Sequence, residues 1–180
     1  IEHCDTYEIN LLSTAFENMT LHLREHERLQ HLLAYRDTLT GLRNTNSYWA
    51  WIVDFDKEIE SKEIDFGVIV LDINYLKETN DKYGHDAGNN LIVAAARIIS
   101  GIFKRSPVFR IGGDEFLIVL FRENQKQRTE EIITSINEKS EAFNKKNAKN
   151  YELLFSIGVC SEKMEDQSLD YFLREADKKM

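Results

Sequence analysis

Three acidic residues stand at positions where carboxylates can do chemistry. Asp72 closes a mostly apolar run rich in β-branched residues, which predicts a strand buried on both faces. Asp114 and Glu115 follow the pair Gly112-Gly113, a sequence typical of a tight hairpin. Magnesium prefers oxygen ligands and usually takes one or two protein carboxylates beside substrate phosphates. The three acids therefore suggest a site that holds magnesium against phosphates.

Each of these acids also has an ordinary structural explanation. Asp114 and Glu115 could be turn residues, which turn statistics alone make as plausible as a functional role. Asp72 is harder to explain in this way, because an unpaired charge at the end of a buried strand is costly. A metal ion would compensate that charge, and so would Lys77, and the residues alone leave both solutions open.

A polar segment from Asn74 to Asn90 follows this strand and contains five side chains of interest. Asparagine carries a donor and an acceptor and can recognise the edge of a base. A single histidine is more often structural. Five such groups between a strand and a helix are a more specific signal than any one alone; they are Lys77, Asn80, Asp81, His85 and Asn89.

The elements that must position these residues alternate along the chain. Apolar periodicity and turn residues predict helices over 45–61, 91–103, 125–146 and 169–180, and strands over 66–73, 107–111, 115–121 and 151–160. Residues 74–90 are expected to form a polar loop. Strands and helices that alternate around one hairpin predict an α/β (α+β) domain with a mixed central sheet flanked by helices.

The N-terminal segment has a different character. Residues 7–35 contain neither Gly nor Pro, and apolar residues recur at spacings of three and four, at Ile9, Leu12, Phe16, Met19, Leu23 and Leu33. His26 and Gln30 fall on the same seam and weaken it. We expect residues 1–35 to form a dimerising coiled-coil stalk; the alternative is an amphipathic helix packed on its own domain.

Composition narrows the function classes. The 180 residues carry a net charge of −8, which argues against binding a nucleic-acid polymer. Two distant cysteines predict no disulfide framework and a cytoplasmic setting, with Cys160 as a small buried hydrophobe. Because the chain runs from Ile1 to Met180, we expect a piece of a longer protein that lacks its C-terminal end. Tethering to the inner membrane would then come only from segments outside it.

Four separated motifs, in order, resemble the GGDEF domains, which are diguanylate cyclases. The resemblance covers about Arg36 to Met180. The motifs are Asp37-Thr38-Leu39-Thr40-Gly41-Leu42-Arg43-Asn44; Asp72-Ile73-Asn74-Tyr75-Leu76-Lys77 with Asn80-Asp81 and Gly84-His85-Asp86-Ala87-Gly88; Arg110-Ile111-Gly112-Gly113-Asp114-Glu115-Phe116; and Ser156-Ile157-Gly158-Val159.

The resemblance implies a fold like the adenylate cyclase core and the polymerase palm. It also implies a reaction in which two GTP molecules condense into cyclic di-GMP with loss of two pyrophosphates, in a bacterial second-messenger pathway. The implied cofactor is Mg²⁺, with Mn²⁺ as a substitute. Each subunit of a homodimer would present one GTP, and an upstream sensor domain would control the activity.

The family's metal and catalytic roles fall on residues already singled out. Asp72 and Asp114 would hold the metal ions, with the backbone carbonyl of Ile73 as a further ligand. Asp114, or alternatively Glu115, would help to deprotonate the attacking 3′-hydroxyl. Lys77 would stabilise the charged phosphates.

The substrate contacts follow in the same way. Asn80 and Asn89 would face the guanine with His85 nearby, and Gly112 and Gly113 would leave room for the nucleotide. The family usually has Asp where this chain has Asn89, which makes selectivity for GTP over ATP less certain.

Two further departures concern regulation and activity. The inhibitory product site of many members, Arg-x-x-Asp, is here Phe103-Lys104-Arg105-Ser106, so product inhibition at that site is not expected. An inactive domain that senses GTP or acts as a scaffold is the alternative from another functional class. Its usual marker is a degraded hairpin motif, which this chain does not have.

Overall fold

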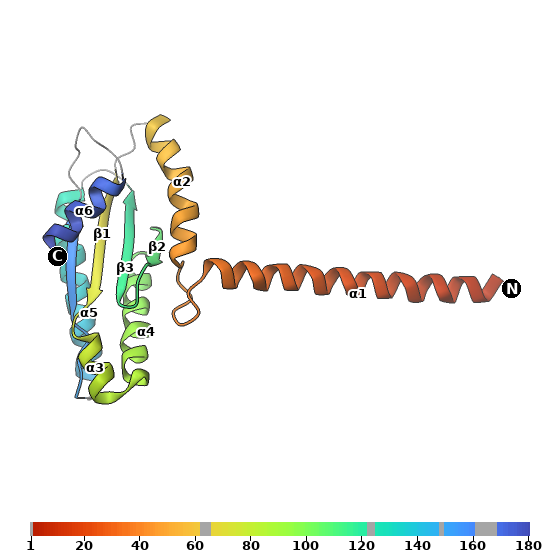
Figure 1. Cartoon of the computed structure of the whole chain (residues 1–180), viewed down its shortest axis with the longest axis horizontal. Coiled ribbons are helices and arrows are strands. Elements are labelled where there is room, and N and C mark those ends of the chain that lie inside the picture. Colours follow the sequence, from red (N-terminus) through yellow and green to blue (C-terminus); the bar gives the residue numbers. More distant parts are fainter. Residues whose placement is uncertain (1, 62–65, 122–124, 148–149, 161–168) are drawn as a thin grey trace. The chain divides into compact units, whose positions relative to one another are not determined.

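A computed structural model describes residues 2–61, 66–121, 125–147, 150–160 and 169–180. The chain divides into two compact units, Ile1–Tyr35 and Arg36–Met180. The first is a single helix, α1 (Glu2–Tyr35). The second is built from α2 (Thr45–Ser61), β1 (Phe66–Ile73), α3 (Leu76–Tyr83), α4 (His85–Ile102), β2 (Val108–Arg110), β3 (Glu115–Phe121), α5 (Gln125–Asn147), β4 (Phe155–Cys160) and α6 (Leu169–Lys179) (Figure 1).

The observed bounds test the predicted elements. The predictions for α2, β1 and β3 are confirmed at both ends, and those for α5 and α6 to within one residue. β4 begins at Phe155 instead of Tyr151, and β2 is confined to Val108–Arg110.

The predicted polar loop over 74–90 is wrong. Its residues form α3 and the first turns of α4, which meet at Gly84. Gly84 has φ 85° and ψ 162°, a conformation that residues with a Cβ rarely adopt, so it separates the two helices. Glu78 in the first turn of α3 and Lys82 in its last turn suit the helix dipole.

The four-stranded sheet has the order β2-β3-β1-β4. The expected α/β architecture is confirmed, but each ladder between its described strands is antiparallel, whereas we predicted a mixed sheet. The reason is topological. β3 lies between β1 and β2, so the connection through α3 and α4 joins strands that run in the same direction without being neighbours. The arrangement is two interleaved split β-α-β units.

β1 is buried on both faces, as predicted, with seven of its eight residues inaccessible. Ile69, Leu71 and Ile73 pack in the core cluster formed with α4 and α5. Val68 and Val70 pack in a second cluster with residues of α2 and α6. Because each fully buried aliphatic side chain contributes about 1.5–3 kcal/mol, this strand is firmly placed. Asp72, the half-buried exception, is therefore held at a fixed point on the sheet.

Aromatic packing fixes α2 on the sheet. The ring of Phe55 meets that of Phe66 of β1 edge-on at 5.2 Å between centroids, and Tyr48 meets Phe109 of β2 edge-on at 5.6 Å. This packing brings the loop that precedes α2 alongside β2, where the amide of Arg110 donates to the carbonyl of Arg43 at 2.8 Å.

α1, taken by itself, exposes the predicted seam. Ile9, Leu12, Phe16, Met19, Leu23 and Leu33 are 52–70% exposed. Leu11, Leu21 and Leu32 lie off the seam and are exposed as well, so the apolar surface of this helix is wider than the heptad pattern predicted.

Two other expectations can be compared with the structure. Cys160 is buried, as predicted. Among the described helices, none combines the length and apolar character needed to cross a membrane.

Gly158 provides a test of the packing between β4 and α6. A Cβ at this position would overlap the backbone carbonyl of Ala176, which cannot move without shifting α6. We expect Gly158→Ala to lower the free energy of unfolding, measured by urea titration, by about 1–3 kcal/mol. Gly101→Ala in α4 is the control: a Cβ there meets open space, so it should stabilise by about 0.5–1 kcal/mol. Equal effects of the two substitutions would contradict this account.

Candidate active site

The pairing of β1 with β3 brings the three carboxylates to one edge of the sheet. Asp72 lies opposite Glu115 in the ladder. One residue further, the amide of Ile73 donates to the carbonyl of Asp114 at 3.2 Å. Side chains on directly opposed residues have Cβ atoms about 4.5–5.5 Å apart. Residues more than forty positions apart in sequence thus form one acidic edge, which we define as Asp72, Asp114 and Glu115.

The acidic edge is electrostatically unfavourable without a cation. Burial, and then the negative charges of Asp114 and Glu115, raise the pKa of Asp72 above its ordinary value. Among the described side chains, neither Lys77 nor any other basic group forms an ion pair with these acids. The sequence left two ways to compensate the charge of Asp72, a metal ion or an ion pair with Lys77, and the structure does not form the ion pair with Lys77.

The donor set of the acidic edge fits a hard divalent cation. It offers carboxylate oxygens and uncompensated negative charge, which Mg²⁺ and Mn²⁺ prefer. In the part of the chain that the structure describes, no group of three or more His, Cys, Asp or Glu side chains is placed to hold a metal ion. Magnesium commonly takes water and substrate phosphates as its other ligands, so one or two of these carboxylates would be the protein's share of such a site.

The two glycines of the hairpin have different surroundings. A Cβ at Gly112 would overlap the Glu115 carboxylate, so this side chain folds back across Gly112 and fills the space. A Cβ at Gly113 would meet nothing within 4 Å. The room expected for a nucleotide is thus open at Gly113 and taken by Glu115 at Gly112.

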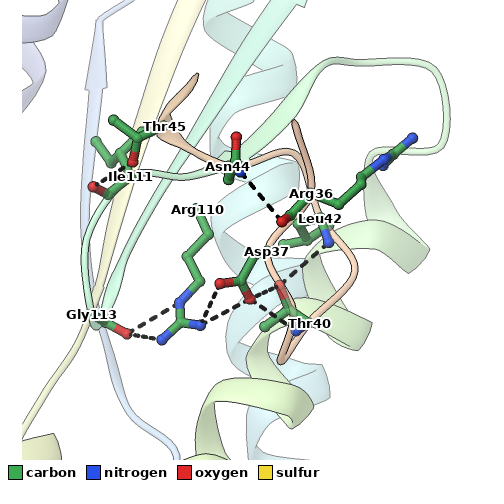
Figure 2. A network of polar contacts seen from close by, with 9 residues as sticks. All are labelled: Arg36, Asp37, Thr40, Leu42, Asn44, Thr45, Arg110, Ile111 and Gly113. Carbon is green, nitrogen blue, oxygen red and sulfur yellow. Dashed lines mark hydrogen bonds and ion pairs between the residues drawn. The ribbon is translucent and has the colours of Figure 1, made fainter. Parts of the chain in front are cut away.

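Arg110 links the hairpin tip to the loop that follows α1, as Figure 2 shows. Its Nη1 donates to both carboxylate oxygens of Asp37, at 2.9 and 3.0 Å. Its Nε and Nη2 donate to the carbonyl of Gly113 at 3.3 and 2.6 Å. The side chains of Arg110 and Asp37 are only 12% and 21% exposed, which protects this contact from solvent screening. The carbonyl beside Asp114 is thereby held by a side chain that Asp37, outside the hairpin, orients.

Asp37 is itself held by its own turn. Its Oδ1 accepts hydrogen bonds from the amide of Thr40 at 2.8 Å and from its hydroxyl at 2.6 Å. Burial alone would raise the pKa of Asp37, but the hydrogen bonds from Thr40 and Arg110 and the charge of Arg110 lower it. Thr45 adds a second link to the hairpin, since its hydroxyl donates to the carbonyl of Ile111 at 3.2 Å.

The Asp37–Arg110 contact was not predicted from the sequence, in which Asp37-Thr38-Leu39-Thr40 stood out only as the start of the first motif. Asp37 and Thr40 have the residue types of a turn that is closed by side-chain hydrogen bonds, so the turn itself could be predicted from the sequence. The partner of Asp37 could not be predicted in this way, because Arg110 lies 73 residues away in the sequence.

The predicted substrate residues lie on two helices. Lys77 and Asn80 belong to α3, and His85 and Asn89 to the start of α4. Lys77, His85 and Asn89 are exposed. Asn80 is half-buried, and its amide group occupies the space that a Cβ at Gly88 would need. Asn80 is therefore fixed against the first turn of α4, next to Asn89.

The turn between β1 and α3 has two further features. The Oδ1 of Asn74 accepts a hydrogen bond from the Ser156 hydroxyl at 2.7 Å, so this residue ties β1 to β4. Tyr75 has φ 61°, the one positive value among the described non-glycine residues, and its side chain is exposed. This left-handed residue helps to turn the chain from the end of β1 at Ile73 into α3 at Leu76, with only Asn74 and Tyr75 between them.

Comparison with known proteins supplies independent evidence. The family model described as "Diguanylate cyclase, GGDEF domain" matches residues 34–180. The chain is 28% identical over 159 residues to a probable diguanylate cyclase, DgcC, of Escherichia coli, covering 86% of this chain and 42% of that protein. It is 38% identical over 85 residues to the diguanylate cyclase DgcS of Shewanella oneidensis, covering 47% and 29%. The chain thus spans less than half the length of these curated relatives.

Solved structures agree on the fold. The coiled coil and GGDEF domain of DgcB from Caulobacter crescentus, in complex with c-di-GMP, superimposes with a TM-score of 0.76 at 24% identity, covering 95% of this chain and 90% of that one. A sensory box/GGDEF family protein from Caulobacter crescentus gives a TM-score of 0.67 at 29% identity, covering 81% and 95%.

The Asp37–Arg110 contact can be measured by a double-mutant cycle. We expect Asp37→Ala, Arg110→Ala and the double variant to give a coupling free energy of about 1–3 kcal/mol in urea unfolding at neutral pH. Because the pKa of Asp37 is lowered, its contribution is complete above its ordinary value of 3.8 and is lost as the pH falls below it. The exposed Glu141–Lys145 pair is the control and should couple by less than about 0.5 kcal/mol. Equal coupling in both pairs would refute the assignment.

The acidic edge predicts an inverse relation between stability and function. Since the pKa of Asp72 is raised, its ionisation opposes folding, and stability falls as the pH rises from 3.8 through the raised pKa. Asp72→Asn should therefore stabilise the metal-free protein at neutral pH by up to about 1 kcal/mol, allowing for solvent screening. Millimolar Mg²⁺ should raise the melting temperature of the wild type more than that of the variant. Asp81→Asn, on the exposed side of α3, is the control; a destabilising Asp72→Asn would count against this interpretation.

Proposed function

Because its residues 34–180 match the family model, the chain belongs to the GGDEF diguanylate cyclase domains, and we propose that it condenses two GTP molecules into cyclic di-GMP and two pyrophosphates. One observation supports this most directly: the acidic edge concentrates Asp72, Asp114 and Glu115 at one end of β1 and β3 without a basic partner among the described side chains. Transfer between phosphates depends on positioning and charge neutralisation more than on covalent chemistry. An uncompensated group of carboxylates is the protein's part of such a site.

Asp72, Asp114 and the carbonyl of Ile73 would hold Mg²⁺, or Mn²⁺ in its place. When bound, the metal supplies neutralisation of triphosphate charge and polarisation of the α-phosphate. Asp114 accepts the proton of the 3′-hydroxyl, with Glu115 as the alternative base. The 3′-oxygen then bonds to the α-phosphorus of the facing GTP, and the bond to pyrophosphate breaks. Lys77 offsets the charge of the phosphates.

Substrate recognition would use the helices after β1. Asn80, fixed against Gly88, and the neighbouring Asn89 face the guanine, with His85 beside them. Gly113 leaves the hairpin open to the nucleotide. Asn89 can accept a hydrogen bond from guanine but carries no charge, so relaxed selectivity that admits ATP is the variant of this function to test.

The reaction calls for two copies of the domain. One acidic edge serves one nucleotide, whereas cyclisation joins two, each providing a hydroxyl and losing a pyrophosphate. We propose a symmetric homodimer in which residues 1–35 form a parallel coiled-coil stalk and residues 36–180 the catalytic domain. The exposed seam of α1 supports this, and His26 and Gln30 at core positions would set its register. The proposal includes a sensor domain that precedes the stalk. It also places the catalytic domain in the cytoplasm, with attachment to the membrane only through segments outside this chain.

A second candidate is a domain that binds GTP without turnover and acts as a sensor or scaffold. The unaltered Gly112-Gly113-Asp114-Glu115-Phe116 motif favours catalysis.

Incubation of the dimeric protein with GTP and Mg²⁺, with products separated by chromatography, decides between these functions. We expect cyclic di-GMP and pyrophosphate in a ratio of one to two. Asp114→Asn should lower kcat by at least about 100-fold because it removes the base. Glu141→Gln, on the surface of α5, should leave kcat unchanged.

The other outcomes are equally informative. A confirmed dimer that binds GTP with Mg²⁺ or Mn²⁺ and forms no product would establish the sensor function instead. A mixed dinucleotide formed when ATP is added would establish relaxed selectivity.

A further inference from the structure

An open groove of about 420 Å³ lies between α4 and α5. Ile98 of α4 and Phe143 of α5 pack on the core beneath it and remain partly exposed, so they present an apolar surface. Gly101 and Ala142 complete the lining with small residues, which let another chain approach closely. Arg97 stands 12 residues beyond His85 along α4, about 18 Å at 1.5 Å per residue. None of the three residues of the acidic edge lines the groove.

The groove is basic although the protein is acidic. Its charged lining residues are Arg97, Lys139 and Lys146, all exposed, and no acidic residue lines it. Among the described residues, none of the three forms an ion pair. The adjacent Lys145 differs, since it pairs with Glu141 at 3.5 Å. The groove therefore gathers uncompensated positive charge on a chain whose net charge is −8.

The helix dipole explains only part of this pattern. Lys145 and Lys146 lie in the last turn of α5, where positive charge is favourable without any ligand. Lys139 lies two turns earlier, and Arg97 belongs to the other helix. Their accumulation around one apolar surface has no such explanation.

The geometry indicates the kind of ligand. The lining residues lie within helices, where backbone amides are already bonded, so the groove has no amide cradle of the type that binds phosphate. Its charges are spread out instead: Lys139 and Lys146 are seven residues apart, about 10.5 Å along one face of α5. Spread charges around an apolar surface suit carboxylates two helical turns apart with an apolar side chain between them.

We propose that the α4–α5 groove binds an acidic amphipathic helix of a partner protein. An apolar side chain of that helix packs on Ile98 and Phe143. Its carboxylates pair with Lys139 and Lys146 on one side and Arg97 on the other. This site does not depend on the cyclase activity, and the two are tested separately.

The test uses a fluorescently labelled helical peptide with glutamates seven residues apart and leucines between them, added to the whole 180-residue chain. We expect saturable binding in fluorescence anisotropy that weakens with salt, and amide NMR shifts centred on Ile98, Gly101 and Phe143. Lys139→Glu with Lys146→Glu should weaken binding by at least about 10-fold, and Arg97→Glu by about 5-fold. Lys145→Glu is the matched control and should change the affinity by less than about 2-fold.

Several results would overturn the proposal. They are no saturable binding, equal binding of a peptide with lysine in place of glutamate, the same loss in the Lys145 variant, or shifts centred elsewhere. Saturation of the groove by inorganic phosphate or GMP in competition with the peptide would identify a site for small anions instead. Circular dichroism and urea midpoints check that each variant is folded.

Discussion

The antiparallel register of β1 and β3 is the constraint on which the rest of the site depends. It places Asp72 opposite Glu115 and next to Asp114 in space. A slip of one residue would exchange the two faces of β1 and move Asp72 away from the hairpin acids. Burial of the strand on both faces opposes such a slip, because it would disrupt two packed clusters at once. The apolar core thus holds together three charges that repel one another.

Arg110 extends this control to the hairpin tip. Hairpin turns are exposed and mobile by default, and here the carbonyl of Gly113 is held by a guanidinium that Asp37 orients. Asp37 follows the last residue of α1 by only two positions. The covalent chain therefore joins the helix to the contact that positions Asp114.

The distribution of charge separates the two proposed sites on one small domain. Negative charge gathers at the strand ends, where a cation and phosphates would offset it. Positive charge gathers in the α4–α5 groove, where carboxylates would offset it. Because screening in physiological salt acts over about 8 Å, the two regions hardly influence each other. The net charge of −8 gives no sign of this local contrast.

The sequence by itself determined the elements with strong local signals and the acidic residues. The β-branched run of β1, the glycine pair before β3 and the apolar face of α2 depend on neighbours in sequence, so their bounds were predictable. Four spaced motifs also indicated the family. α3 was missed because its polar residues show no apolar period. Only the tertiary structure decided the antiparallel sheet, the partner of Arg110 and the filling of Gly112 by Glu115. The sheet order and the Arg110 contact join distant segments, and the Gly112 contact depends on the turn geometry, so local propensity carries no information about any of them.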